Sequence, residues 1–139
     1  MMLAVDSSGW LARFLQGPFH QLAVTTFSSH ESWGASSLAL SESLVALARL
    51  DADPTQSVAM AQLMRHDWGM VYSVPVDAAI LDHATELSTN SFIRLSDAIH
   101  LASAARLPKP VSFLTFDAAQ IPAALELGLD VISTLAADS

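Results

Sequence analysis

Four acidic residues, far apart along the chain, have the chemistry of a site for a hard metal ion: Asp6, Glu42, Asp97 and Asp117. Asp6 and Asp117 each close a short apolar run that is typical of a buried strand, while Glu42 and Asp97 lie in segments with helical spacing. Carboxylates that a fold brings together repel one another, so a cluster is costly unless it holds a cation such as Mg²⁺ or Mn²⁺. The sequence therefore predicts a metal site assembled from distant segments.

Each acid taken alone also has a simpler interpretation. Asp6 could simply end a strand, with Ser8 capping the helix that follows. Asp117 could cap the helix behind it, and Asp97 could stabilise a helix amino terminus through the helix dipole. Glu42 is harder to explain in this way, because it follows an apolar run and an unpaired buried carboxylate is expensive. The joint pattern of all four acids favours the metal site.

Two other kinds of side chain could take part in the chemistry. His100 lies three residues after Asp97 and on the same side of a helix, yet an all-oxygen site suits the acids better, so we expect His100 to be a packed, hydrogen-bonded residue. Arg13 and Arg94 are possible phosphate contacts, although solvated surface charge is the ordinary role for each.

The segments that must position these residues alternate between strand and helix. Strands are predicted over residues 3–6, 34–37, 70–74, 111–116 and 130–133. Helices are predicted from a Ser7 or Ser8 cap to residue 15, and over residues 20–29, 40–50, 54–68, 77–87, 96–106 and 118–127. This order predicts an α/β fold, a three-layer α/β/α sandwich with a mainly parallel sheet, in which ligands bind outside the carboxyl ends of the strands.

Composition limits the class of protein. The chain has 139 residues, which suits a single domain over residues 1–139, and 52% of them are hydrophobic, which excludes a disordered chain. The net charge of −8 argues against a protein that coats nucleic acid through bulk electrostatics. There is no cysteine for a disulfide or a thiol nucleophile. Because no secretory leader and no membrane-spanning stretch are recognised, a cytoplasmic location is expected.

Five segments, in this order, resemble a PIN domain, and most closely the VapC-type toxins. They are Val5-Asp6-Ser7-Ser8, Leu40-Ser41-Glu42-Ser43-Leu44, Leu95-Ser96-Asp97-Ala98-Ile99-His100-Leu101-Ala102, Leu114-Thr115-Phe116-Asp117 and Leu127-Gly128-Leu129. The similarity covers nearly the whole chain, from residue 3 to about residue 132. The Asp97 segment followed by Thr-Phe-Asp is its most specific part.

The resemblance implies a Mg²⁺- or Mn²⁺-dependent endoribonuclease, the toxin of a type II toxin–antitoxin pair. The metal-binding and catalytic acids of the family would fall on Asp6, Glu42, Asp97 and Asp117, and its hydroxyl-bearing supporting positions on Ser7 or Ser8 and on Thr115. Carboxylate oxygens are the ligands that hard cations prefer, and a bound ion can activate water for attack on phosphorus.

The resemblance also implies partners. These are an RNA substrate, a VapB-like antitoxin that covers the metal pocket and, commonly in this family, a second copy of the chain as a homodimer. No membrane partner is expected. Two alternatives remain open: a non-catalytic PIN-like binding module, and a receiver-like phosphoacceptor domain with a Mg²⁺ pocket. The receiver fits less well, because Asp6 stands without a paired acid and Lys109-Pro110 precedes a strand instead of following one.

Overall fold

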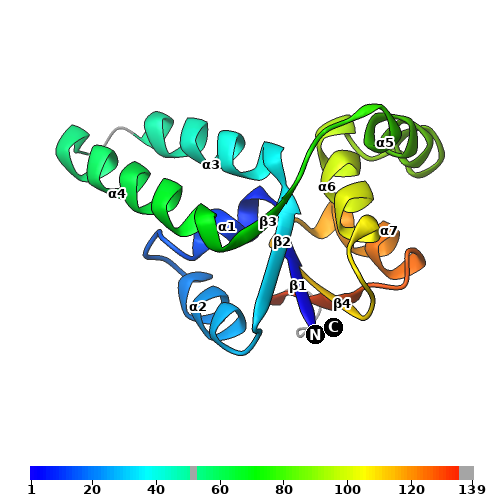
Figure 1. The fold of residues 1–139 in the computed structure, drawn as a ribbon. Helices are drawn as coiled ribbons and strands as arrows, with labels where there is room; N and C mark the ends of the chain where they lie inside the picture. The colour runs from blue at the N-terminus through cyan, green and yellow to red at the C-terminus, as the bar shows by residue number, and fades with distance from the viewer. Residues whose placement is uncertain (51–52, 135–139) are drawn as a thin grey trace.

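A five-stranded parallel sheet forms the centre of the molecule in a computed structural model that describes residues 1–50 and 53–134 (Figure 1). The strands are β1 (Met2–Val5), β2 (Ser32–Ser36), β3 (Val71–Val74), β4 (Val111–Leu114) and β5 (Asp130–Ile132). Their order across the sheet is β3-β2-β1-β4-β5, and every neighbouring pair runs parallel. The predicted α/β sandwich with a parallel sheet is confirmed.

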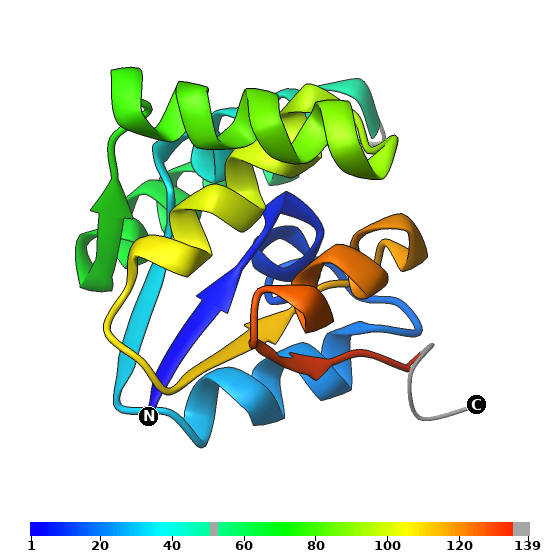
Figure 2. The ribbon, with the colours of Figure 1, turned by 90° about the vertical axis from the view of Figure 1, so that its right-hand side faces the viewer.

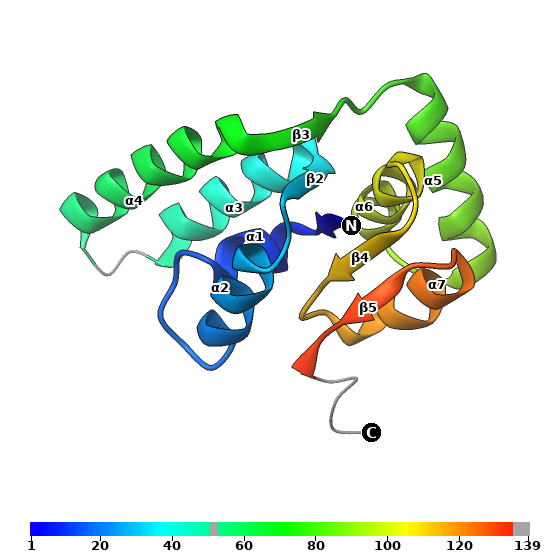
Figure 3. The same ribbon diagram turned by 60° about the horizontal axis from the view of Figure 1, so that its bottom comes forward.

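Helices cover both faces of this sheet (Figures 1 and 3). One face carries α1 (Ser7–Ala12), α2 (His20–Ser28), α3 (Ser37–Leu50) and α4 (Pro54–Asp67). The other face carries α5 (Ala78–Ser91), α6 (Leu95–Arg106) and α7 (Ile121–Glu126). Two short 3₁₀ turns, η1 (Trp68–Met70) and η2 (Ala118–Gln120), complete the described elements. Among the described residues, no helix is long and apolar enough to cross a membrane.

The central strand β1 contributes to both hydrophobic cores. Leu3 and Val5 pack with the α1–α4 layer, while Ala4 points to the α5–α7 layer, as the two-residue period of a strand requires. All three side chains are buried. A strand that is buried on both faces reads as a continuous apolar run, which is why this segment was recognisable from the sequence.

The predicted boundaries shift at several elements. Asp6, not Ser7 or Ser8, caps α1, because its backbone is extended and its carboxylate accepts the Gly9 amide. The helix then ends at Ala12 instead of residue 15. The strand predicted at residues 34–37 runs over Ser32–Ser36, and the strand predicted at residues 111–116 ends at Leu114.

Candidate active site at the carboxyl ends of β1 and β4

The direction in which successive strands are added reverses between β1 and β4. From β1 the chain builds β2 and β3 on one side of the sheet, and β4 and β5 on the other. Such a reversal leaves a crevice outside the carboxyl ends of the two strands, where parallel α/β proteins bind ligands. Val5 is the register partner of Leu114, so Asp6 and Thr115 follow at the same level, and Figure 2 shows β1 and β4 side by side.

Asp6 is held by four hydrogen bonds. Its Oδ1 accepts from Ser8 Oγ at 2.7 Å and from the Gly9 amide at 2.9 Å. Its Oδ2 accepts from Thr115 Oγ1 at 2.7 Å and from Gln120 Nε2 at 2.9 Å. Burial raises the pKa of Asp6, against the opposing effect of these donors. Since a carboxylate offers about four lone-pair sites, protein donors already occupy all of them.

Asp97 shares a donor with Asp6, although 91 residues of sequence separate the two carboxylates. Gln120 Nε2 also donates to Asp97 Oδ1 at 3.1 Å, so one buried amide bridges both acids. The Gln120 Oε1 atom is buried and has no hydrogen-bond partner among the residues that the structure describes. Asp97 lies in the first turn of α6 and is 7% exposed. The structure therefore brings these two predicted site residues together.

Asp117 joins the cluster through Arg94. The Arg94 Nε atom lies 3.3 Å from Asp97 Oδ2, and its Nη2 atom lies 3.7 Å from Asp117 Oδ2. Asp117 also caps the η2 turn by accepting from the Ala119 amide at 3.0 Å. The capping interpretation of Asp117 is thus confirmed, and Arg94 links its carboxylate to that of Asp97. Arg94 was predicted as a possible phosphate contact, and its side chain is 78% exposed here.

Glu42, on α3, is hydrogen-bonded to a histidine of α6, the helix that carries Asp97. His100 Nε2, on α6, lies 2.5 Å from Glu42 Oε1 and donates to it. This hydrogen bond lowers the pKa of Glu42, and Ser7 and the charge of Arg94 act in the same direction. His100 is buried, as predicted for a packed residue, and within the described part of the chain its Nδ1 atom has no hydrogen-bond partner. Its part in orienting Glu42 was not predicted.

The hydroxyl-bearing residues support the acids in the described structure. Ser8 Oγ donates to Asp6 and accepts from the Phe116 amide at 2.9 Å. Thr115 Oγ1 donates to Asp6 and accepts from the Asp117 amide at 3.1 Å. These bonds tie the end of β1 to the end of β4. Ser7 instead helps to lower the pKa of Glu42, so the two serines of the predicted pair act on different acids.

The donor chemistry suits a hard cation, but the carboxylates are not arranged around one. Within residues 1–50 and 53–134, no group of three or more His, Asp or Glu side chains is placed so that it could hold a metal ion. Nitrogen donors lie between the acids instead: Gln120 bridges Asp6 and Asp97, and Arg94 bridges Asp97 and Asp117. A cation that binds Asp6 and Asp97 together must therefore displace the Gln120 amide. The metal-binding role of the four acids stays a prediction.

Arg13 is not available as a phosphate contact. Its Nη1 atom lies 2.6 Å from Asp67 Oδ2, and its guanidinium lies about 5 Å from the aromatic rings around it. Those rings belong to Trp10, Phe14, Phe27 and Trp33. Arg13 thus joins the end of α1 to the end of α4 through a mostly buried ion pair. The prediction that Arg13 could contact phosphate was wrong, because its charge is already paired with Asp67.

Comparison with known proteins shows that other solved structures share this fold. The sequence matches no family model and no curated protein. A toxin–antitoxin complex from Klebsiella pneumoniae is 15% identical with a TM-score of 0.70, over 95% of this chain and 96% of that chain. Mycobacterium tuberculosis VapC20, a Sarcin-Ricin loop cleaving toxin, is 22% identical with a TM-score of 0.70, over 88% and 95%. FitAcB from Neisseria gonorrhoeae is 14% identical with a TM-score of 0.65, over 95% and 96%.

The chain has the fold of these toxins. Identities of 14–22% carry the architecture and nothing finer. The chemistry has to be argued from the site itself.

Proposed function

We propose that this chain is a divalent-metal-dependent endoribonuclease and the toxin of a type II toxin–antitoxin pair. The observation that carries the proposal is the bridge that Gln120 makes between Asp6 and Asp97 at the reversal point of the sheet. The fold holds these two acids together although they are distant in sequence. Their mutual repulsion and their burial both cost free energy, and a purely structural role would not require that cost. The fold adds support, because VapC20 cleaves RNA.

Asp6, Glu42, Asp97 and Asp117 would hold Mg²⁺ or Mn²⁺. When bound, such an ion supplies a water of lowered pKa and neutralises charge on the reacting phosphate. Ser8 and Thr115 fix the orientation of Asp6, and His100 fixes that of Glu42. Arg94 reaches the acids from an exposed position, so its guanidinium can turn toward a phosphate once a cation shields Asp97 and Asp117.

The partner we propose is an antitoxin whose basic segment binds at the acidic site. The net charge of −8 attracts such a segment, and the solved structures of this fold include toxin–antitoxin complexes. A cytoplasmic location fits this pairing. A homodimer remains a prediction from the sequence resemblance.

Cleavage of RNA with Mg²⁺, Mn²⁺ or chelator tests the proposed function. Asp97→Asn should lower metal-dependent cleavage by more than about 100-fold, because changes to even the outer partners of metal ligands reduce activity by about 10- to 100-fold. The variant should melt in chelator at or above the temperature of the wild type, since one charge leaves a repulsive cluster. Asp82→Asn, on the exposed side of α5, is the matched control and should cleave normally.

Two results would contradict the proposal. An Asp97→Asn protein as active as the wild type would remove Asp97 from the chemistry. A wild-type protein that cleaves no RNA with either ion, across a pool of transcripts, would instead favour the non-catalytic binding module. The strand order argues against the receiver alternative, because receivers have the order 2-1-3-4-5, whereas this sheet has the order 3-2-1-4-5.

A further inference from the structure

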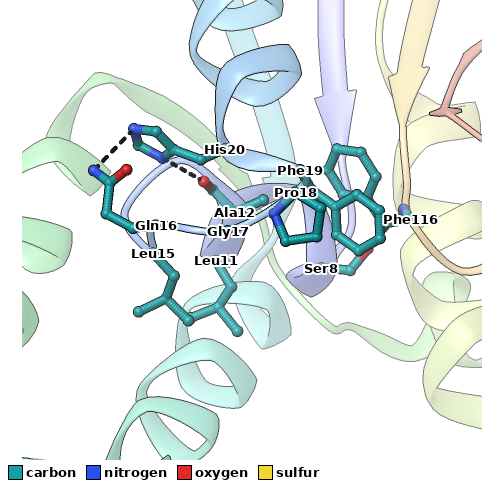
Figure 4. A pocket seen from close by; sticks show the side chains of 10 residues that line it. All are labelled: Ser8, Leu11, Ala12, Leu15, Gln16, Gly17, Pro18, Phe19, His20 and Phe116. Atoms are coloured by element: carbon teal, nitrogen blue, oxygen red, sulfur yellow. Dashed lines mark hydrogen bonds between the residues drawn. The ribbon is translucent and has the colours of Figure 1, made fainter.

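A pocket of about 310 Å³ opens beside the acidic site, between α1, the segment after it and the end of β4 (Figure 4). Leu11 and Leu15 line one part, and Phe19 and Phe116 line another. The two rings are stacked, with centroids 4.5 Å apart and planes inclined by 13°. Phe19 is 38% exposed, because residues 16–18 carry the chain to the surface.

Three polar side chains line this pocket: Ser8 lies beside Phe116, and Gln16 and His20 lie together at another edge (Figure 4). His20 Nδ1 lies 3.0 Å from the Ala12 carbonyl oxygen, which can only accept, so Nδ1 carries the proton. In the neutral ring, Nε2 is then an acceptor, and the Gln16 amide lies 3.5 Å away. An apolar floor, an aromatic wall and one hydrogen-bonding edge are the features that hold a flat heterocycle.

The pocket is joined to the acidic site by covalent neighbours and hydrogen bonds. Ser8 lines the pocket and donates to Asp6. Phe116 lines the pocket, and the residues on either side of it, Thr115 and Asp117, belong to the acidic cluster. A ligand ring in the pocket and a phosphate at the acids would therefore be close enough to belong to one nucleotide or to neighbouring nucleotides of a strand.

We propose that this pocket binds one unpaired nucleobase of a single-stranded RNA, next to the phosphate at the acidic site. The proposal rests on the proposed ribonuclease function and names the part of the substrate that the site recognises. The base packs against the Phe19–Phe116 pair and presents an N–H group to His20 Nε2. Every base can stack on an aromatic ring, so the pocket accepts bases of any sequence. The base must first be free of its pairing partner, so the pocket selects flexible, unpaired RNA over paired RNA.

Binding of a short labelled single-stranded RNA in chelator tests the pocket without cleavage. Phe19→Ala should weaken binding roughly 10-fold, within the range known for loss of one base–aromatic stack. Phe19→Trp should bind at least as well as the wild type. Tyr72→Ala removes an aromatic ring that is exposed on β3 instead, and should leave affinity unchanged. All three should melt close to the wild type, since both positions are exposed.

A series of RNAs with one abasic position locates the base. The wild type should lose affinity at a single position, and Phe19→Ala should show no further loss there. In cleavage assays with Mn²⁺, Phe19→Ala should raise KM while kcat stays near that of the wild type. Equal RNA affinity and KM for Phe19→Ala and the wild type would overturn the pocket and leave the nuclease intact.

The remaining outcomes are also decisive. If Phe19→Ala weakens only the retention of a co-purified protein partner, the pocket belongs to a protein interface and the nucleobase is excluded. If the wild type neither binds nor cleaves RNA, the proposed function fails first and the nucleobase pocket fails with it.

Discussion

At the scale of the residue, the decisive feature is the saturation of the Asp6 carboxylate. Ser8, Gly9 and Thr115 donate to it from its own turn or from the neighbouring strand end. Gln120 is the exception, because its amide nitrogen donates to both Asp6 and Asp97 while its oxygen has no partner in residues 1–50 and 53–134. Gln120 is therefore the donor that a cation can displace at least cost.

Gln120→Glu should replace the bridging amide with a carboxylate next to those of Asp6 and Asp97. In chelator near neutral pH, the variant should melt roughly 5–15 °C below the wild type, because hydrogen bonds to charged groups contribute about 1.5–3 kcal/mol each and a like charge replaces them. Mn²⁺ should raise its melting temperature more than that of the wild type. Thermal melts with and without the ion measure both effects.

The control for this experiment is Gln56→Glu, which adds the same charge at an exposed position of α4. It should melt close to the wild type in both conditions. Equal stabilisation of the wild type and Gln120→Glu by Mn²⁺ would mean that the ion does not bind between Asp6 and Asp97.

At the scale of the element, the close packing of α1 against the strand ends positions the site. A Cβ atom at Gly9 would lie 2.7 Å from the Leu114 carbonyl oxygen and 3.2 Å from Val5 Cβ. No side chain fits at that distance from backbone. Because Gly9 has no side chain, α1 can begin directly after Asp6 and pack against the ends of β1 and β4. In this position the Gly9 amide donates to the Asp6 carboxylate.

Gly9→Ala should therefore lower the free energy of unfolding by about 1–3 kcal/mol, the usual cost of overpacking. Gly17→Ala is the matched control, because no atom of the described residues lies within 4 Å of a Cβ atom there and its φ is not positive. That variant should be neutral or slightly stabilising. Urea denaturation of both proteins measures the difference, and equal midpoints would show that α1 can shift away from β4 freely.

The strand ends could be predicted from the sequence, whereas the contacts between distant elements could not. The apolar runs of β1 and β4 and the acids behind them are local patterns, so Asp6 and Asp117 could be placed at strand ends from the sequence. The Gln120–Asp6 bond spans 114 positions, and no local pattern marks it. The exposure of Phe19 likewise depends on the course of the chain around Gly17-Pro18, which no local pattern marks.

At the scale of the whole molecule, two separate cores lie on opposite faces of one sheet. The acids come from both sides: Glu42 belongs to α3 in one layer, and Asp97 belongs to α6 in the other. The site is thus the place where the two layers meet across the strand ends. Its geometry depends on how α3 and α6 are held, and the Glu42–His100 bond is a direct link between them.

The α5–α6 layer carries an ion pair whose contribution to the stability of the molecule depends on pH. Arg106 binds both oxygens of Asp77, at 2.9 and 3.0 Å, and its hydrogen bond lowers the pKa of Asp77 to about 2. A lowered pKa means that the ionised form is favoured on folding, so the stabilisation is complete above the ordinary pKa of 3.8 and is lost as pH falls toward about 2.

Asp77→Asn should keep the cap of α5, because Asn caps as well as Asp, and should lose only the charge pairing with Arg106. Its melting temperature should lie below that of the wild type at pH 7, and the gap should close as pH falls through the window from 3.8 to about 2. Melts across that range, with Asp82→Asn as the control, measure it. A gap that stays constant with pH would assign the loss to the cap.

The fully buried Thr115 hydroxyl, held between Asp6 and the Asp117 amide, has a spectroscopic consequence. A hydroxyl proton that is sealed from water and bound to a carboxylate exchanges slowly enough to give its own NMR resonance. The side-chain amide protons of Gln120 are sealed in the same way. Titration with diamagnetic Mg²⁺ should move the Gln120 signals first and the Thr115 signal less, which would record the order in which the donors of Asp6 give way.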